Sequence, residues 1–133
     1  MGAAREAAAR YILLSLGLLG RPEQVRLLLY VLEARGVFTA PELVEACVLP
    51  RGRVYPFVAG LQRRGVIVRA PRPAEPAEWV EVYGRGVLAR RRRELHVTGA
   101  APLLLDRGKL RELAERGGCG AEALWVLEVG LAG

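Results

Sequence analysis

The stretch VFTAPELVEACVLPRGRVYPFVAGLQRRGVIVRA, residues 37–70, decides the fold. Its first part carries the signals of a helix start. Thr39 is a candidate N-cap, and Glu42 three residues later completes a capping box. Pro41 falls in the first turn, where its missing N–H is harmless. We therefore expect a short helix over residues 40–48.

A second helix is predicted in RGRVYPFVAGLQRRG, residues 51–65. Its apolar residues follow the spacing i, i+3, i+4, i+7, which is typical of one buried helix face. They are Val54, Phe57, Val58 and Leu61. Pro56 requires the helix to begin near Arg53 or to be kinked, and Gly65 ends it. The connection CVLPRG is short, as the turn of a helix-turn-helix requires.

Two helices precede this pair, and a hairpin follows it. We expect the upstream helices over residues 3–19, with Gly20 as the stop, and over residues 21–36. Downstream, GVIVRAP (65–71) and EWVEVYG (78–84) predict two strands joined in a hairpin.

The rest of the chain predicts three more helices. Asp106 is a candidate N-cap, and Gly117 and Gly118 are candidate stops. The segment HVTGAAPLLL fits no element clearly. The expected helices cover residues 85–95, 107–118 and 121–132.

The order helix, short helix, helix, hairpin is that of a winged helix-turn-helix. We therefore predict a mainly α protein with a small β-hairpin: a winged helix-turn-helix with additional N- and C-terminal helices. The 133 residues suit one domain, 1–133, with a winged-helix core over about 21–84. The flanking helices, 3–19 and 86–132, are possible dimerisation elements because they hold more leucine and valine than one small core covers.

The positive charge is concentrated in one segment. The whole chain has 20 basic and 14 acidic residues, a net charge of +6. Residues 51–93 hold 11 arginines and three glutamates, so this segment carries +8 and the remainder carries −2. Such an asymmetry favours a surface that faces a polyanion.

Residues 28–70 resemble the winged-helix domain of TrmB-type and MarR-like archaeal transcription regulators. The matching parts are TAPEL in the second helix, RGRVY at the start of the third, and LQRRGVIV at its end. The resemblance implies a transcription regulator that binds duplex DNA as a homodimer through flanking helices. Two features depart from the family: Pro56 lies inside the recognition helix, and the large sugar-binding domain of full-length TrmB proteins is missing. Sugar sensing is therefore not carried over, and any small-molecule effector stays unknown.

The arginines of the third helix and the wing are the candidate DNA contacts. Arginine neutralises phosphates and can hold guanine through a bidentate pair. Tyr55 is suited to a phosphate or a thymine methyl. The wing residues would lie near the adjacent backbone or minor groove. The predicted DNA-binding residues are Arg51, Arg53, Tyr55, Arg63, Arg64, Arg69, Arg72, Arg85, Arg90, Arg91 and Arg92.

Three other interpretations stay open. The arginines, including the run ARRRRE at 89–94, could be solvating groups on a winged helix that serves as a protein-interaction module of a replication, repair or other multiprotein assembly. RNA or single strands could stack on Tyr55, Trp79 and Tyr83. Trp79 and Tyr83 could instead fill the space between the wing and the helices.

No residue pattern points to catalysis. A nucleophile, a base and an oxyanion site are not assembled anywhere in the sequence. His96, Cys47 and Cys119 lack the spacing of a metal site, so the cysteines are better explained as small buried hydrophobes. We expect no enzymatic activity, no metal and no cofactor.

The sequence also predicts where the protein works. No apolar run reaches the 18 residues that cross a bilayer. YILLSLGLLG near the N-terminus is hydrophobic like a signal peptide, but Glu6 interrupts the positive lead and no cleavage pattern follows. Two distant cysteines make no disulfide framework. We expect a cytoplasmic protein without a membrane partner, and the absence of asparagine fits a thermophilic source.

Overall fold

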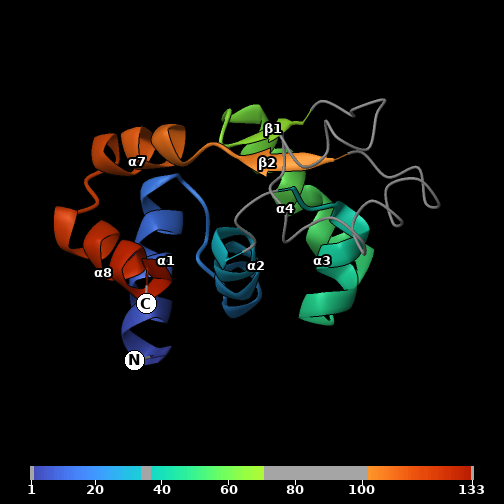
Figure 1. The fold of residues 1–133 in the computed structure, drawn as a ribbon, viewed down its shortest axis with the longest axis horizontal. Coiled ribbons are helices and arrows are strands. Elements are labelled where there is room, and N and C mark those ends of the chain that lie inside the picture. Colours follow the sequence, from blue (N-terminus) through green and yellow to red (C-terminus); the bar gives the residue numbers. More distant parts are fainter. Residues whose placement is uncertain (1, 34–36, 71–101, 133) are drawn as a thin grey trace. The chain divides into compact units, whose positions relative to one another are not determined.

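The computed structural model describes residues 2–33, 37–70 and 102–132 (Figure 1). This part of the chain is mainly helical, with six helices and a small two-stranded antiparallel sheet, which confirms the predicted fold class at that level. The internal contacts divide the chain into two compact units. Unit 1 comprises residues 1–33 and 106–133, and unit 2 comprises residues 34–105.

Unit 1 is a group of helices built around the first one. Helix α1 (Gly2–Ser15) packs against α2 (Pro22–Glu33), α7 (Arg107–Arg116) and α8 (Ala121–Ala132). The side chains of α1 that these neighbours bury are Ala8, Ala9, Ile12 and Leu13. Helix α8 covers the same residues as the predicted helix 121–132, so this prediction is confirmed.

Helix α1 ends at Ser15, four residues earlier than the predicted 3–19. The cause is Gly17, whose φ of 84° is left-handed. Its N–H donates to the carbonyl of Leu14, and the N–H of Leu18 donates to the carbonyl of Leu13, at 3.0 and 2.9 Å. This pair of bonds is a Schellman motif, which closes a helix before the next glycine, Gly20, is reached.

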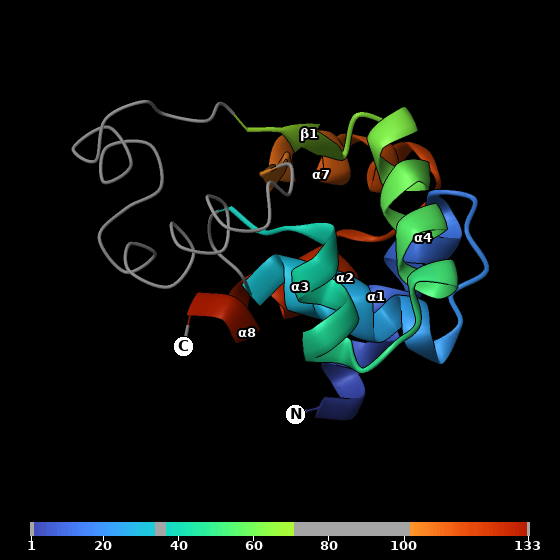
Figure 2. The same ribbon diagram turned by 90° about the vertical axis from the view of Figure 1, so that its right-hand side faces the viewer.

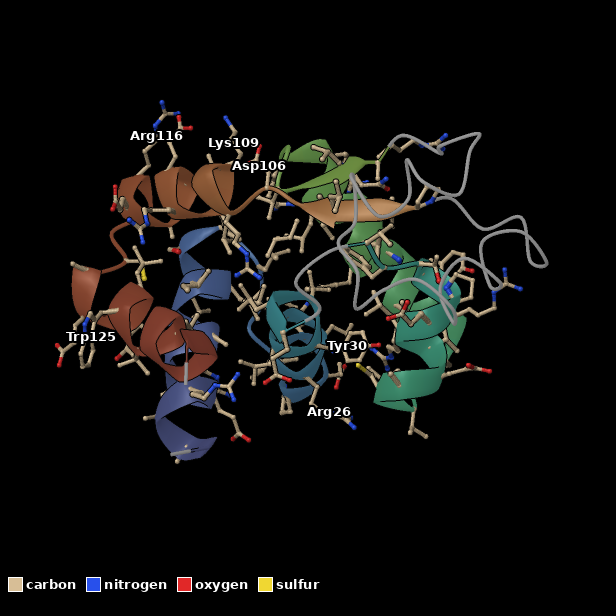
Figure 3. The ribbon with its side chains drawn as sticks, viewed as in Figure 1. Arg26, Tyr30, Asp106, Lys109, Arg116 and Trp125 are labelled. Carbon is tan, nitrogen blue, oxygen red and sulfur yellow. The ribbon has the colours of Figure 1, made fainter. Side chains whose placement is uncertain are left out.

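The ends of the other helices in unit 1 follow local signals. Asp106 caps α7 by accepting from the main-chain N–H of Lys109 at 3.0 Å, as predicted (Figure 3). Gly118, with φ 91°, closes the far end. The guanidinium of Arg107 donates to the carbonyl of Leu32, which satisfies one of the free carbonyls at the end of α2.

Unit 2 begins with the predicted helix pair, α3 (Ala40–Cys47) and α4 (Arg51–Arg63), which lie next to each other in both views (Figures 1 and 2). The hydroxyl of Thr39 accepts from the N–H of Glu42 at 3.2 Å, so the predicted N-cap is confirmed. Val48, after α3, is left-handed with φ 52°. This turn directs the chain into α4.

The small sheet joins segments that are far apart in the sequence. Strand β1 (Ile67–Arg69), within the predicted 65–71, pairs antiparallel with β2 (Leu103–Leu105). Phe38 lies on the other side of β2 and exchanges two main-chain hydrogen bonds with Leu103. The sequence did not assign a strand at 103–105. The predicted strand 78–84 and the predicted helix 85–95 lie outside the described residues.

None of the helices in the described ranges is both long and apolar enough to span a lipid bilayer.

Candidate nucleic-acid interface on α4

Helix α4 turns one face inward and the rest of its surface outward. The predicted stripe of Val54, Phe57, Val58 and Leu61 is buried, at most 5% exposed. Pro56 is exposed and lies inside the helix, which begins at Arg51 rather than near Arg53. Consecutive residues are 100° apart around a helix, so the buried stripe occupies less than half of the circumference. The remaining, outward surface is more than half.

Three of the predicted arginines share one side of this surface, which we call the basic flank: Arg53, Arg63 and Arg64. A Cβ on Gly60 would lie 3.4 Å from Nη1 of Arg64 and 3.7 Å from Nη2 of Arg63, so both guanidinium groups lie beside Gly60. Arg64 also donates to the carbonyl of Gly60 at 2.8 Å. Arg53 is two turns earlier on the same side, because seven residues separate it from Gly60. The missing side chain of Gly60 thus lets positive charge gather close to the helix backbone.

The other side of α4 is electrostatically mixed. The Arg51 guanidinium lies 4.9 Å from the centre of the Tyr55 ring and donates to its hydroxyl at 3.3 Å. Both side chains line a hollow of about 520 Å³, which Glu42 and Glu45 of α3 also line. The two carboxylates repel phosphate, so this side is less suited to a polyanion than the basic flank.

A second hollow, of about 390 Å³, continues from the first along α4. Tyr55 and Pro41 line both. The second is also lined by Gln62 of α4 and by Arg69 at the end of β1. Arg69 is exposed and lines this hollow together with residues in the C-terminal half of α4.

Between the two sides runs a line of residues with small or closed side chains. Gly52, Pro56 and Ala59 follow one another at intervals of four and three, which places them on one strip of the outward surface. None of the three has a side-chain hydrogen-bond donor or acceptor. At these three positions another molecule can approach the α4 backbone closely, and Arg63, four residues after Ala59, continues the strip with a guanidinium group.

The structure therefore locates six of the eleven predicted DNA-binding residues: four on α4, Arg64 at its C-cap, and one on β1. They do not form a single cluster, since Arg51 belongs to the mixed side and Arg69 to the second hollow. The remaining predicted residues lie outside the described residues: Arg72, Arg85, Arg90, Arg91 and Arg92. Trp79, Tyr83 and His96 lie there too.

Sequence reasoning missed the two acids that line the same hollow as Arg51. A signal for them was present, because Glu42 and Glu45 are one turn apart on the helix that precedes α4. Their effect depends on how α3 packs against α4, which the sequence pattern of either helix does not specify.

The cysteines are buried, free thiols. Burial raises the pKa of Cys119, and a hydrogen bond with Ser15 opposes this shift to a lesser extent. The neutral thiol is thus the favoured form. Within the described part of the chain, no group of three or more histidine, cysteine or acidic side chains is placed to hold a metal ion.

Compared with known proteins, the chain matches no protein-family model, no curated protein and no solved structure.

Proposed function

We propose that this protein is a winged-helix transcription regulator that binds duplex DNA through α4 and an arginine-bearing wing. The basic flank would lie along the phosphate backbone, and the strip of Gly52, Pro56 and Ala59 would face the groove. Binding would be driven by the release of counterions from the phosphates that the arginines neutralise.

The observation that carries the proposal is the gathering of the Arg63 and Arg64 guanidinium groups beside Gly60, which they help to bury, with the exposed Arg53 two turns away. A phosphate beside two adjacent guanidinium groups can accept charge-assisted hydrogen bonds from both. The two acids that line the hollow with Arg51 support the same orientation, because they disfavour DNA on that side of α4.

The order of elements in unit 2 supports the winged-helix assignment. Strand β1 follows α4 directly, and its pairing with β2 makes a sheet from which a wing can extend. The N–H of Ala70 donates to the carbonyl of Pro102 at 2.9 Å, so the ladder continues one step beyond the strands. The two described residues that flank segment 71–101 are therefore paired next to Arg69, and this segment holds the other five predicted arginines.

The direct test is fluorescence anisotropy with a labelled duplex of random sequence across a salt series. If the arginines neutralise about six phosphates, the log–log slope of affinity against salt should be about −5. A single strand of the same length separates duplex binding from the stacking of bases on aromatic side chains. Failure to retain duplex DNA at low salt would overturn the proposal.

One observation favours the alternative of a protein-interaction module. The hollow between α3 and α4 combines an aromatic ring, Pro41 and two acids, a lining that suits a basic protein segment better than a phosphate. A complex with another protein that withstands salt, together with no duplex retention, would support this alternative.

A further inference from the structure

The outward face of α1 carries apolar side chains that unit 1 leaves uncovered. Tyr11 is 64% exposed and Leu14 is 50% exposed, whereas the opposite face of the same helix is buried. Ala4 and Ala7 precede them on this face and are exposed as well. The four residues follow one another at intervals of three, four and three. This is the spacing of a seam that packs against another helix.

A hollow of about 460 Å³ opens beside this seam, between α1 and α2. Its apolar lining includes Ala3 and Ala7 of α1 and Val25 and Leu29 of α2. Glu6 and Arg10 of α1 line it too. The hollow lies at the alanine end of the seam, because alanine leaves space where tyrosine and leucine fill it further along.

We propose that a second copy of this chain covers the seam, with the two α1 helices antiparallel about a two-fold axis near residue 9. In this register Ala7 faces Tyr11 of the partner subunit, and Ala4 faces Leu14 of the partner subunit. The large side chains of each copy meet the small side chains of the other, and Tyr11 of the partner subunit enters the hollow. A two-fold interface must be self-complementary in this way.

The charges on α1 agree with the same register. Glu6 and Arg10 are one turn apart on one flank of the seam. In an antiparallel pair the same flanks meet, so Glu6 of one copy comes to lie beside Arg10 of the partner subunit, offset by two residues or about 3 Å along the axis. Arg10 is held on this surface by its Nε, which donates to the carbonyl of Gly20 at 3.1 Å. The interface thus gains two symmetric ion pairs.

A second copy explains the seam better than an unrelated partner does. One helix carries both the large side chains and the small side chains that would pack together. The large ones are Tyr11 and Leu14, and the small ones are Ala4 and Ala7. One helix pair is a small interface, so we expect a dimer that dissociates on dilution. The inference rests on the homodimer that the sequence predicts, and it is tested without DNA, so its failure leaves the DNA-binding proposal standing.

The first experiment measures mass by sedimentation equilibrium over a range of concentrations. We expect the wild type to be a dimer at high concentration and Tyr11→Glu to be a monomer with unchanged helical content by circular dichroism. Trp125→Ala is the matched control, because Trp125 is 61% exposed but belongs to α8 (Figure 3), and it should dimerise like the wild type. A wild type that is monomeric at all concentrations, or a dimer that Tyr11→Glu leaves intact, would overturn the proposal.

The second experiment tests the register with a short thiol cross-linker. Ala4→Cys mixed with Leu14→Cys should give a covalent dimer, whereas neither variant alone should, because ten residues along a helix separate like positions by about 15 Å. The native thiols are buried, so the wild type serves as the blank. Cross-linking of Ala4→Cys with itself would show a parallel pair and contradict the antiparallel register.

Discussion

Gly117 lies so close to the main chain of Ser15 that a Cβ on this glycine would be 2.0 Å from the Ser15 carbonyl oxygen. Only glycine fits there without a backbone shift. The contact fastens the end of α7 to the end of α1, two helices that come from opposite ends of the sequence.

Replacing Gly117 with alanine should therefore destabilise the protein strongly. The atoms in the way belong to the backbone, so we expect a loss of at least about 2 kcal/mol in the free energy of unfolding. Gly120→Ala is the matched control, because nothing lies within 4 Å of a Cβ at that position. Urea denaturation measures both variants. Equal stability of the two would show that α7 and α1 do not approach as described.

Substitutions in the basic flank should weaken DNA binding. Arg53→Ala and Arg63→Ala each remove one exposed cation, so each should lower duplex affinity and reduce the magnitude of the salt slope by about 0.9. Arg116→Ala is the control: Arg116 pairs with Glu112 at 2.9 Å at the end of α7, far from the flank in sequence (Figure 3). Wild-type affinity in both α4 variants would exclude this surface.

Val48→Gly should raise the stability of the protein. Val48 adopts a left-handed backbone with φ 52°, which costs a β-branched residue about 1–2 kcal/mol and costs glycine almost nothing. Its side chain is 83% exposed, so little packing is lost. We expect a gain of about 1 kcal/mol, measured by thermal or urea unfolding. Val48→Ala, which keeps a Cβ, should gain less.

Replacing residues 71–101 with a short Asn-Gly turn should separate the fold from DNA binding. The hydrogen bond between Ala70 and Pro102 holds the two ends of this connection together, so a two-residue turn can join them. The shortened protein should still unfold cooperatively in urea, because β1 and β2 keep their hydrogen-bonded ladder. Duplex affinity and the salt slope should both decrease, because five predicted contacts are removed. An unchanged slope would show that these arginines do not contact DNA.

The thiols should be unreactive in the folded protein and should make it sensitive to alkali. Burial raises the pKa of Cys119, so the folded state prefers the neutral thiol. Stability is therefore retained below the ordinary thiol pKa and lost as the pH rises above it, because the unfolded chain ionises first. Ellman's reagent should titrate both cysteines only after unfolding. Rapid reaction of the native protein would contradict the burial of these side chains.

The parts of the fold that the sequence predicted are those with local causes. The Thr39 cap and the Asp106 cap depend on a side chain and an N–H three residues apart. The buried stripe of α4 depends only on the helix period. The end of α1 was misplaced because two glycines compete there, and the first of them already closes the helix.

The parts that were missed are non-local. Strand β2 is a run of three leucines, Leu103–Leu105, without alternation, and its partner lies more than 30 residues away. Its role appears only when Phe38 and β1 are known to flank it. Within the candidate site, the arginines could be named from charge and spacing. Their separation into a basic flank and a mixed side depends on the packing of α3 on α4 and on the gap at Gly60.

The division of the chain into units bears on the order in which the protein can fold as it is made. Unit 2 is continuous, from residue 34 to residue 105, so its whole sequence has been synthesised before α7 is begun. Unit 1 needs both ends of the chain, and α1 has to wait for α7 and α8 to cover Ile12 and Leu13. The residues of the inner unit are therefore all present in the growing chain before those of the outer unit are complete.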